Sequence, residues 1–167
     1  MSSDAERRHV FISHHHADDQ SVSDMTSLLQ KKGYDIRNSS IRATAKPANQ
    51  ERLDKGLIKK EVLQRLLRMK ISWASTTVVL IGKETHSRPW VNWEIEQANK
   101  LGKQIVGVYE RGNTEAKIPP ALEKYATSIV NWNSDSIIGA IDGSANSFQN
   151  PDGSQRSPTH ARVSVTC

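Results

Sequence analysis

The sequence predicts an α/β fold in which a mostly parallel five-stranded sheet carries helices on both faces. Short runs of apolar and β-branched residues alternate along the chain with segments whose apolar residues recur at helical spacing, and this alternation is typical of parallel sheets. The run at residues 76–81 is apolar or β-branched throughout, which fits a central strand covered on both faces. Both observations favour a layered domain.

The expected elements follow in order from their periodicity and their boundary residues. Strands are expected at residues 9–13, 34–37, 76–81, 104–109 and 128–132, and helices at 18–32, 53–73, 90–101 and 134–141. Gly33 and Gly102 follow the first and third helices, and glycine commonly ends a helix. Pro89 suits the first turn of the third helix, and Ser134 or Asp135 is expected to cap the fourth. Elements in this order form a flavodoxin-like doubly wound fold.

The second helix, at residues 53–73, is expected to be amphipathic. Its apolar stripe is predicted from residues at helical spacing, which are Ile58, Val62, Leu66 and Met69, flanked by Leu63 and Leu67. The segment before it, residues 38–50, is polar, contains Pro47 and is expected to be a loop.

The basic charge of the chain is concentrated in one segment. The chain has 23 Lys or Arg and 18 Asp or Glu, a net charge of +5, and residues 46–70 account for the whole excess. This segment is either a surface for phosphates or an acidic partner, or the solvated face of an amphipathic helix. Nucleic-acid binding is not expected, because no aromatic residues are interleaved with the basic ones.

Composition predicts one domain at residues 8–142 and a flexible C-terminal tail at residues 143–167. A length of 167 residues suits one domain with a core, and from residue 144 the chain is rich in Ser, Asn, Pro, Gly and Arg. The sequence shows no apolar run that would span a membrane and no signal peptide, and its single cysteine is Cys167. A cytoplasmic protein without an internal disulfide is therefore expected.

Several familiar kinds of site have no counterpart in the sequence. It contains no Gly-x-Gly-x-x-Gly or Walker loop for a nucleotide cofactor and no Gly-x-Ser-x-Gly nucleophile motif. The three histidines at residues 14–16 point to alternate sides of an extended backbone, so a metal site is not expected. No resident cofactor is expected either.

The most informative residue is Glu94, in the helix at residues 90–101. At ~100° per residue, the apolar residues of this helix fill one arc of about 140°. They are Trp90, Val91, Ile95, Ala98 and Leu101. Glu94 falls inside this arc, whereas Glu96 falls on the opposite side. Because an unpaired buried carboxylate has a high free-energy cost, Glu94 either pairs with a basic or amide group and supports packing, or serves a functional site.

The topology places Glu94 near the expected binding region. In open parallel sheets, ligands bind beyond the carboxyl ends of the strands. Ser13 and the histidines after it leave the first strand at that edge, and the helix at residues 90–101 begins there. The first turn of this helix, with Trp90, Trp93 and Glu94, is therefore expected to face a cleft.

Two segments resemble TIR domains. Residues 8–13, Arg-His-Val-Phe-Ile-Ser, are similar to the first strand of these domains, and residues 87–95, Ser-Arg-Pro-Trp-Val-Asn-Trp-Glu-Ile, are similar to their Ser-x-x-Trp-Cys/Val-x-x-Glu-Leu/Ile signature. Within this superfamily the chain most resembles the TIR-like subunit of bacterial Thoeris anti-phage systems. The similar features are Asn-Ser-Ser at residues 38–40, the long basic helix, and the Val-Leu-Ile-Gly run at residues 79–82 followed by Thr85. The resemblance covers about residues 8–142.

The resemblance implies an enzyme of the NAD glycohydrolase or ADP-ribosyl cyclase type. Enzymatic TIR domains cleave the nicotinamide–ribose bond of NAD, and Thoeris members make a cyclic or conjugated ADP-ribose signal that activates a separate effector protein. The signature glutamate corresponds to Glu94, and a carboxylate beside an oxocarbenium-like ribose stabilises the developing positive charge. A phage component or self-assembly is the expected trigger, and no membrane partner is expected.

Substrate-binding residues are predicted around Glu94. Ser13 and His14 are candidates for holding the ribose or the diphosphate. Trp93 is a candidate for stacking on a flat base, and Trp90 is assigned to the core. Many TIR domains have an aromatic residue where this chain has His14, so the details of the pocket are expected to differ.

A second group of candidates lies in the loop after the second strand. Asn38 and Ser39 belong to a loop that in TIR domains flanks the nucleotide and mediates assembly. Arg42 and Lys46 are candidates for meeting phosphates in the same loop.

Two other functions fit the same features. A non-catalytic TIR-type module would act as a scaffold by self-assembly, and a nucleoside hydrolase or transferase would use the glutamate on free nucleosides rather than on NAD. Glu94 favours an enzyme, because a scaffold has no need of a carboxylate in the apolar arc. The choice of substrate separates the two enzymes.

Overall fold

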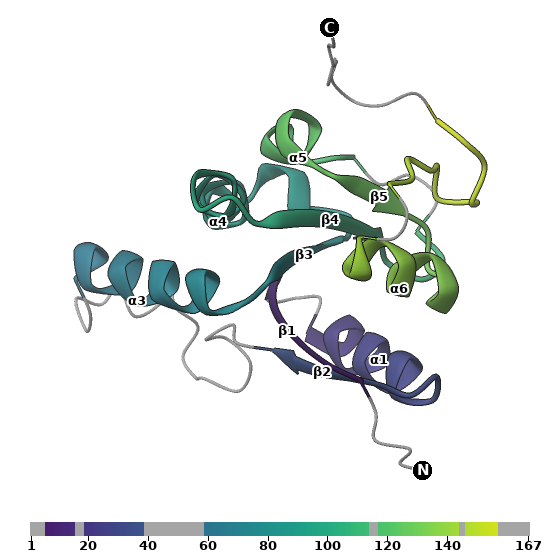
Figure 1. The fold of residues 1–167 in the computed structure, drawn as a ribbon. Helices are drawn as coiled ribbons and strands as arrows, with labels where there is room; N and C mark the ends of the chain where they lie inside the picture. Colours follow the sequence, from purple (N-terminus) through teal and green to yellow (C-terminus); the bar gives the residue numbers. More distant parts are fainter. Residues whose placement is uncertain (1–5, 16–18, 39–58, 114–116, 144–145, 157–167) are drawn as a thin grey trace, which may run out of the picture.

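The centre of the fold is a parallel sheet of five strands in the order β2-β1-β3-β4-β5 (Figure 1). The strands are β1 (Glu6–Ser13), β2 (Tyr34–Asn38), β3 (Thr76–Ile81), β4 (Gln104–Tyr109) and β5 (Ser128–Val130). The structure is a computed structural model that describes residues 6–15, 19–38, 59–113, 117–143 and 146–156. β3 is the central strand and all of its residues are buried, as its apolar sequence predicts.

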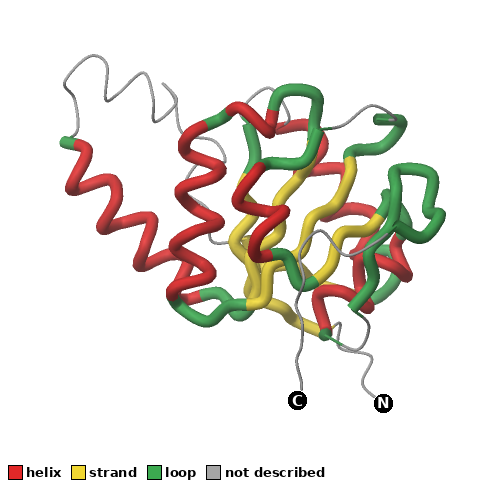
Figure 2. The backbone as a smooth tube through the Cα atoms, turned by 90° about the horizontal axis from the view of Figure 1, so that it is seen from above, coloured by secondary structure: helices red, strands yellow, loops and turns green. Residues whose placement is uncertain are grey.

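Helices cover both faces of the sheet, so the predicted doubly wound α/β fold is confirmed (Figures 1 and 2). One face carries α1 (Asp19–Gln30) and α6 (Ser134–Asp142), and the other carries α3 (Lys60–Trp73), α4 (Pro89–Lys100) and α5 (Pro120–Tyr125). No helix among the described residues is long and apolar enough to cross a membrane.

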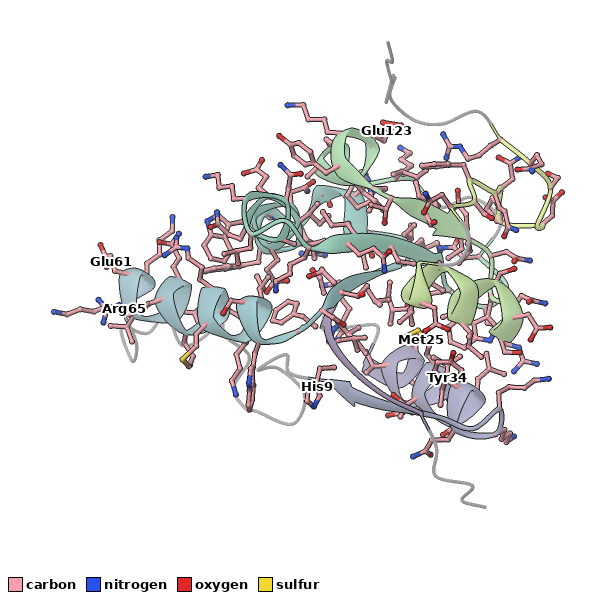
Figure 3. All side chains as sticks on the ribbon, in the orientation of Figure 1. His9, Met25, Tyr34, Glu61, Arg65 and Glu123 are labelled. Carbon is pink, nitrogen blue, oxygen red and sulfur yellow. The ribbon has the colours of Figure 1, made fainter. Side chains whose placement is uncertain are left out.

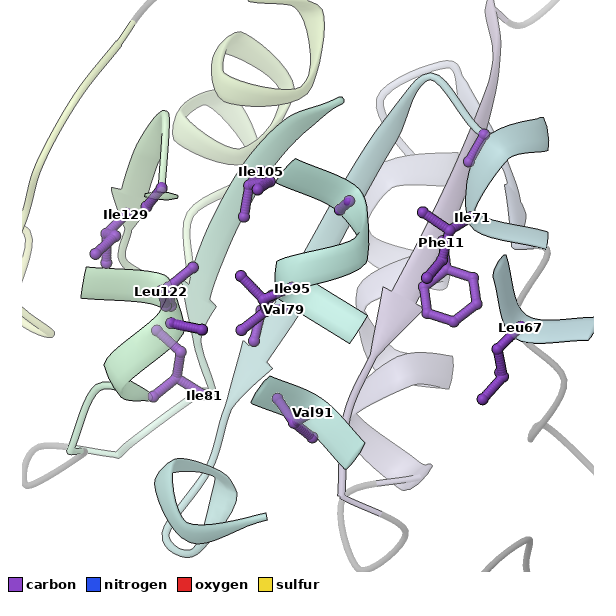
Figure 4. Packing of buried hydrophobic residues seen from close by; sticks show 14 of the residues in the cluster. Phe11, Leu67, Ile71, Val79, Ile81, Val91, Ile95, Ile105, Leu122 and Ile129 are labelled. Atoms are coloured by element: carbon purple, nitrogen blue, oxygen red, sulfur yellow. The ribbon is translucent and has the colours of Figure 1, made fainter. Parts of the chain in front are cut away.

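Side chains alternate between the two faces along β3, which explains its continuous apolar run. Val78 and Leu80 belong to the core beneath α1 and α6, whereas Val79 and Ile81 belong to the core beneath α3, α4 and α5. Figure 4 shows Val79 and Ile81 packed with residues of α4 and α5. A strand with helices on both sides needs apolar residues at every position.

The helix boundaries largely follow the local signals in the sequence. Gly33 and Gly102 have positive φ angles of 85° and 71°, the conformation in which glycine ends a helix without strain. The cap of α6 was predicted wrongly: it is Asn133, whose side-chain oxygen accepts a hydrogen bond from the backbone N–H of Ser136. Asparagine caps a helix as well as Ser or Asp does, so residue type alone does not fix the position.

Two short elements were not predicted, the helix α5 and the 3-10 helix η2 (Thr85–Ser87). α5 has only six residues, too few to show a helical period. It packs closely on β4 at Gly107, where an added Cβ would lie 2.8 Å from Leu122 Cδ2. Glycine at this position lets the helix approach the sheet.

The apolar stripe predicted for α3 is wrong. Val62 and Met69 are 45% and 56% exposed, and the buried row is Leu63, Leu67 and Ile71. The sequence carries two neighbouring apolar rows at helical spacing, and the row that contains Ile71 packs with the core of the sheet (Figure 4). Ile58 and the first part of the predicted helix lie outside the described residues, as do residues 39–50 of the predicted loop. The first residue of that predicted loop, Asn38, is instead the last residue of β2.

The predicted tail also needs a correction, because residues 146–156 lie against β5. The N–H of Ile129 donates to the carbonyl of Ser147, and the N–H of Gln149 donates to the carbonyl of Ile129. Arg156 Nη1 donates to the hydroxyl of Tyr109 at 3.3 Å. Composition missed these contacts because they are made mainly by backbone groups of an edge strand, which any sequence can pair. Residues 157–167 lie outside the described part of the chain.

The two apolar rows of α3 give a matched test of the fold. We expect Leu67→Ala to lower the free energy of unfolding by about 2–4 kcal/mol, because it opens a cavity in the core. Met69→Ala, two residues away on the exposed row, is expected to change it by less than about 0.5 kcal/mol. Urea denaturation of both variants measures the difference. Equal losses for the two would show that the row containing Met69 is also buried.

Candidate active site

Glu94 lies on the sheet-facing side of α4, one turn from the start of the helix. Its neighbours Val91, Ile95 and Ala98 are buried, while Glu94 itself is partly exposed and Glu96 is exposed. The predicted apolar arc is therefore confirmed for Val91, Ile95 and Ala98. It is wrong for Leu101, which is 39% exposed, because α4 ends at Lys100 and Leu101 lies at its cap.

Ser13 meets Glu94 from the last position of β1. Strand alternation places Ser13 on the same face as Phe11, beneath α4, and its side chain is 1% exposed. The Ser13 hydroxyl donates a hydrogen bond of 2.6 Å to Glu94 Oε1. The structure thus brings together two predicted site residues that are far apart in the sequence.

Burial controls the charge of Glu94. Loss of hydration raises the pKa of its carboxyl group from 4.5 to about 8, and the hydrogen bond from Ser13 opposes this rise by stabilising the charged form. Within the described part of the chain, no cationic side chain contributes to this pKa. Among the described residues, Glu94 therefore has a hydrogen-bond donor but no permanent counter-charge.

His14 follows Ser13 and is partly exposed. Its Nδ1 lies 3.2 Å from the carbonyl oxygen of Ile12 and donates to it in the tautomer that protonates this nitrogen. Among the described residues, no group of three His, Cys, Asp or Glu side chains is placed to hold a metal ion.

The two tryptophans of α4 pack against each other and against the core. Their rings meet edge to face, with centroids 5.5 Å apart and an angle of 79° between the planes. Both Trp90 and Trp93 are partly buried, so the prediction that only Trp90 belongs to the core is too simple. One contact of Trp93 comes from α3, where the guanidinium carbon of Arg68 lies 5.6 Å from a ring centroid.

Asn92 fixes the start of α4, a role that was not predicted. Its side-chain nitrogen donates to the carbonyls of His86 and Arg88, and its side-chain oxygen accepts a hydrogen bond from the N–H of Ala121 in α5. One amide thus joins η2, α4 and α5. A polar residue between Val91 and Trp93 was the only sequence signal, and it does not identify these partners.

The remaining predicted site residues are only partly described. Asn38 is the last residue of β2 and pairs in register with Val10 of β1, three residues before Ser13, so β2 ends before the level that Ser13 occupies in the sheet. Ser39, Arg42 and Lys46 lie outside the described residues, so their predicted roles stay predictions.

The family model for the Thoeris protein ThsB, TIR-like domain, matches residues 11–115. The chain belongs to this family. The match covers more than half of the chain and contains Ser13, Glu94, α3 and α4.

The chain is similar to a protein from Bacillus cereus and to a solved structure from Clostridium botulinum. The former, from Bacillus cereus (strain MSX-D12), is named "Putative cyclic ADP-D-ribose synthase ThsB1" and is 35% identical over 63 residues, or 34% of this chain and 33% of that protein. The matching region thus spans about a third of that relative. Among solved structures, Clostridium botulinum CMP N-glycosidase, BcmB, has a TM-score of 0.47 at 14% identity, over 83% of this chain and all of that one. A structural similarity at this level carries no information about activity.

The raised pKa of Glu94 predicts how stability depends on pH. Between the unfolded pKa of 4.5 and the folded pKa of about 8, only the unfolded chain releases this proton, so the stability contributed by the neutral carboxyl is lost as pH rises through this window. Glu94→Gln is neutral at every pH. We expect its melting temperature to rise relative to wild type by roughly 10 °C between pH 5 and pH 8.5.

The exposed carboxyl of Glu96 provides the control for this titration. Glu96→Gln makes the same substitution on the solvent side of the same helix, and it shows how much of the change comes from the amide itself and not from burial. A constant difference in melting temperature between Glu94→Gln and wild type over this pH range would show that folding does not raise the pKa of Glu94.

Proposed function

We propose that this domain cleaves the nicotinamide–ribose bond of NAD at Glu94 and forms a cyclic ADP-ribose-type product that activates a separate effector protein. The observation that carries the proposal is the partly exposed carboxyl of Glu94, which Ser13 holds at the carboxyl end of β1 and which has no cationic side chain stabilising it in the described part of the chain. Membership of the ThsB family and the name of the Bacillus cereus relative support it. NAD is the substrate, and the reaction requires no resident cofactor.

The chemistry of NAD complements this carboxyl group. The pyridinium ring of NAD is a cation, and when the glycosidic bond breaks both bonding electrons pass to its nitrogen. Nicotinamide then leaves as a neutral molecule and the positive charge develops on the ribose. A carboxylate next to the ribose stabilises that charge most strongly in the transition state. Attack by water gives ADP-ribose and a proton, and attack by a nitrogen of the adenine within the same molecule gives a cyclic product and a proton.

The protonation state of Glu94 links binding to pH. With a pKa of about 8, the carboxyl is mostly neutral at pH 7 in the free protein. A bound pyridinium cation favours the charged form and lowers this pKa, so substrate binding releases the proton. Because the carboxylate is the active form, kcat/KM for NAD is expected to rise with pH up to about 8.

The decisive test compares wild type, Glu94→Gln and Glu96→Gln by mass spectrometry of NAD and its products, on purified protein and on phage-infected cells. We expect Glu94→Gln to lower the rate of nicotinamide release roughly 100-fold or more, because it removes the charge that stabilises the ribose cation. Glu96→Gln, on the exposed side of the same helix, should retain wild-type activity. NAD left intact by wild type in both settings would refute the proposal.

A second function is favoured by the exposed apolar row of α3. Met69 and Trp73 are 56% and 69% exposed, and large apolar side chains gathered on one surface often mark an interface. A non-catalytic module that acts by self-assembly would use such a surface.

Sedimentation over a range of concentrations tests this second function. If the domain acts by assembly, the mass of wild type rises with concentration and that of the double variant Met69→Ser, Trp73→Ser does not. Leu101→Ser, which changes an exposed apolar residue at the C-terminal cap of α4, serves as the control. If wild type assembles through α3 and leaves NAD intact, the domain is a scaffold and not an enzyme. If the mass of wild type stays that of a monomer at all concentrations, self-assembly through α3 is excluded.

A further inference from the structure

Arg68 joins α3 to α4 beside the candidate active site. Its Nε donates a hydrogen bond of 3.0 Å to Gln97 Oε1, and its guanidinium carbon lies 5.6 Å from a ring centroid of Trp93. Gln97 is one of the few buried polar residues of the domain. Its side chain therefore orients the guanidinium, which lies over the ring of Trp93.

The orientation of Arg68 leaves most of its donors available. Only one of the five N–H groups of the guanidinium bonds to Gln97, and the two Nη groups carry the other four. Arg68 is exposed, and it has no acidic partner in the described part of the chain. A guanidinium held this way presents a planar pair of donors that matches the oxygens of a phosphate.

The two residues of α4 that contact Arg68 lie on one side of Glu94 around the helix. Trp93 immediately precedes Glu94 in the chain, and Gln97 follows it by three residues, so at ~100° per residue Gln97 projects between Trp93 and Glu94 around the helix. Arg68 nevertheless does not act as the counter-ion of Glu94, since burial and the Ser13 hydroxyl are what set the pKa of that carboxyl. The positive charge of Arg68 is therefore available to a ligand.

We propose that Arg68 binds the diphosphate of the dinucleotide substrate, with Gln97 and Trp93 orienting its guanidinium. This inference rests on the proposed function for the identity of the ligand. In NAD the diphosphate lies one ribose away from the glycosidic bond that faces Glu94. When the ribose of the substrate lies at Glu94, the negatively charged diphosphate lies near the side chains around Glu94. Arg68 is the cation among them that binds it. Arg68 thereby selects for substrates that carry a diphosphate over free nucleosides.

The test measures binding of ADP-ribose by calorimetry and cleavage of two substrates, NAD and nicotinamide riboside, which share the same glycosidic bond but differ in the diphosphate. Arg68→Gln is expected to weaken ADP-ribose binding and to raise KM for NAD roughly 10-fold or more, with kcat changed by less than about 2-fold. Cleavage of nicotinamide riboside should stay at the wild-type level. Arg65→Gln removes one charge from the exposed surface of the same helix and should match wild type throughout (Figure 3).

A second variant separates binding from a purely structural role of Arg68. Arg68→Lys keeps the charge and loses the planar pair of donors, so ADP-ribose binding should fall roughly 3-fold or more while the melting temperature stays near that of wild type. If Arg68→Gln lowers kcat on both substrates alike, or if wild type and Arg68→Gln bind ADP-ribose equally, Arg68 only braces the two helices and the inference is wrong. Absence of ADP-ribose binding to wild type would also overturn it.

The same measurements keep the two proposals apart. Wild type that binds ADP-ribose through Arg68 but leaves NAD intact would contradict the proposed reaction and retain the diphosphate site. Wild type that cleaves NAD, together with an Arg68→Gln variant of unchanged KM, would retain the reaction and exclude the site.

Discussion

The candidate site depends on a carboxyl group that folding partly removes from water and that has no counter-charge in the described part of the chain. Burial alone favours the neutral form of Glu94, and the Ser13 hydroxyl is the one hydrogen bond described for it that favours the charged form. The balance between these two effects leaves a carboxyl that titrates close to physiological pH. A positively charged ligand stabilises the charged form of such a carboxyl group, and the pyridinium ring of NAD carries a positive charge.

The fold holds the Ser13 hydroxyl and the Glu94 carboxyl group in fixed positions relative to each other. Ser13 is held at the end of a buried strand next to the central strand β3, and Glu94 is held by a helix whose Val91, Ile95 and Ala98 are packed in the core. Asn92 ties the first turns of that helix to η2 and α5, so its position relative to β1 does not depend on apolar packing alone. Two elements from distant parts of the chain thereby fix the distance between one hydroxyl and one carboxylate.

The sequence predicts those features that a local pattern determines. The apolar run of β3 identifies the central strand, and helical spacing in α4 separates Glu94 from Glu96. It does not determine which of two adjacent apolar rows of α3 is buried, because that choice depends on Phe11 and the rest of the core. For the same reason, the local sequence pattern does not predict contacts between polar side chains that are far apart in the chain. Ser13 with Glu94, and Arg68 with Gln97, pair only once β1, α3 and α4 have packed together.

The most direct measurement of the central claim is an NMR titration of the Glu94 carboxyl carbon, with and without the pyridinium cation 1-methylnicotinamide. The account predicts a titration midpoint near 8 in the free protein and a lower midpoint with the cation bound. A midpoint near 4.5 for Glu94, the usual value of a glutamate, would contradict the account, and so would a raised midpoint that the cation leaves unchanged.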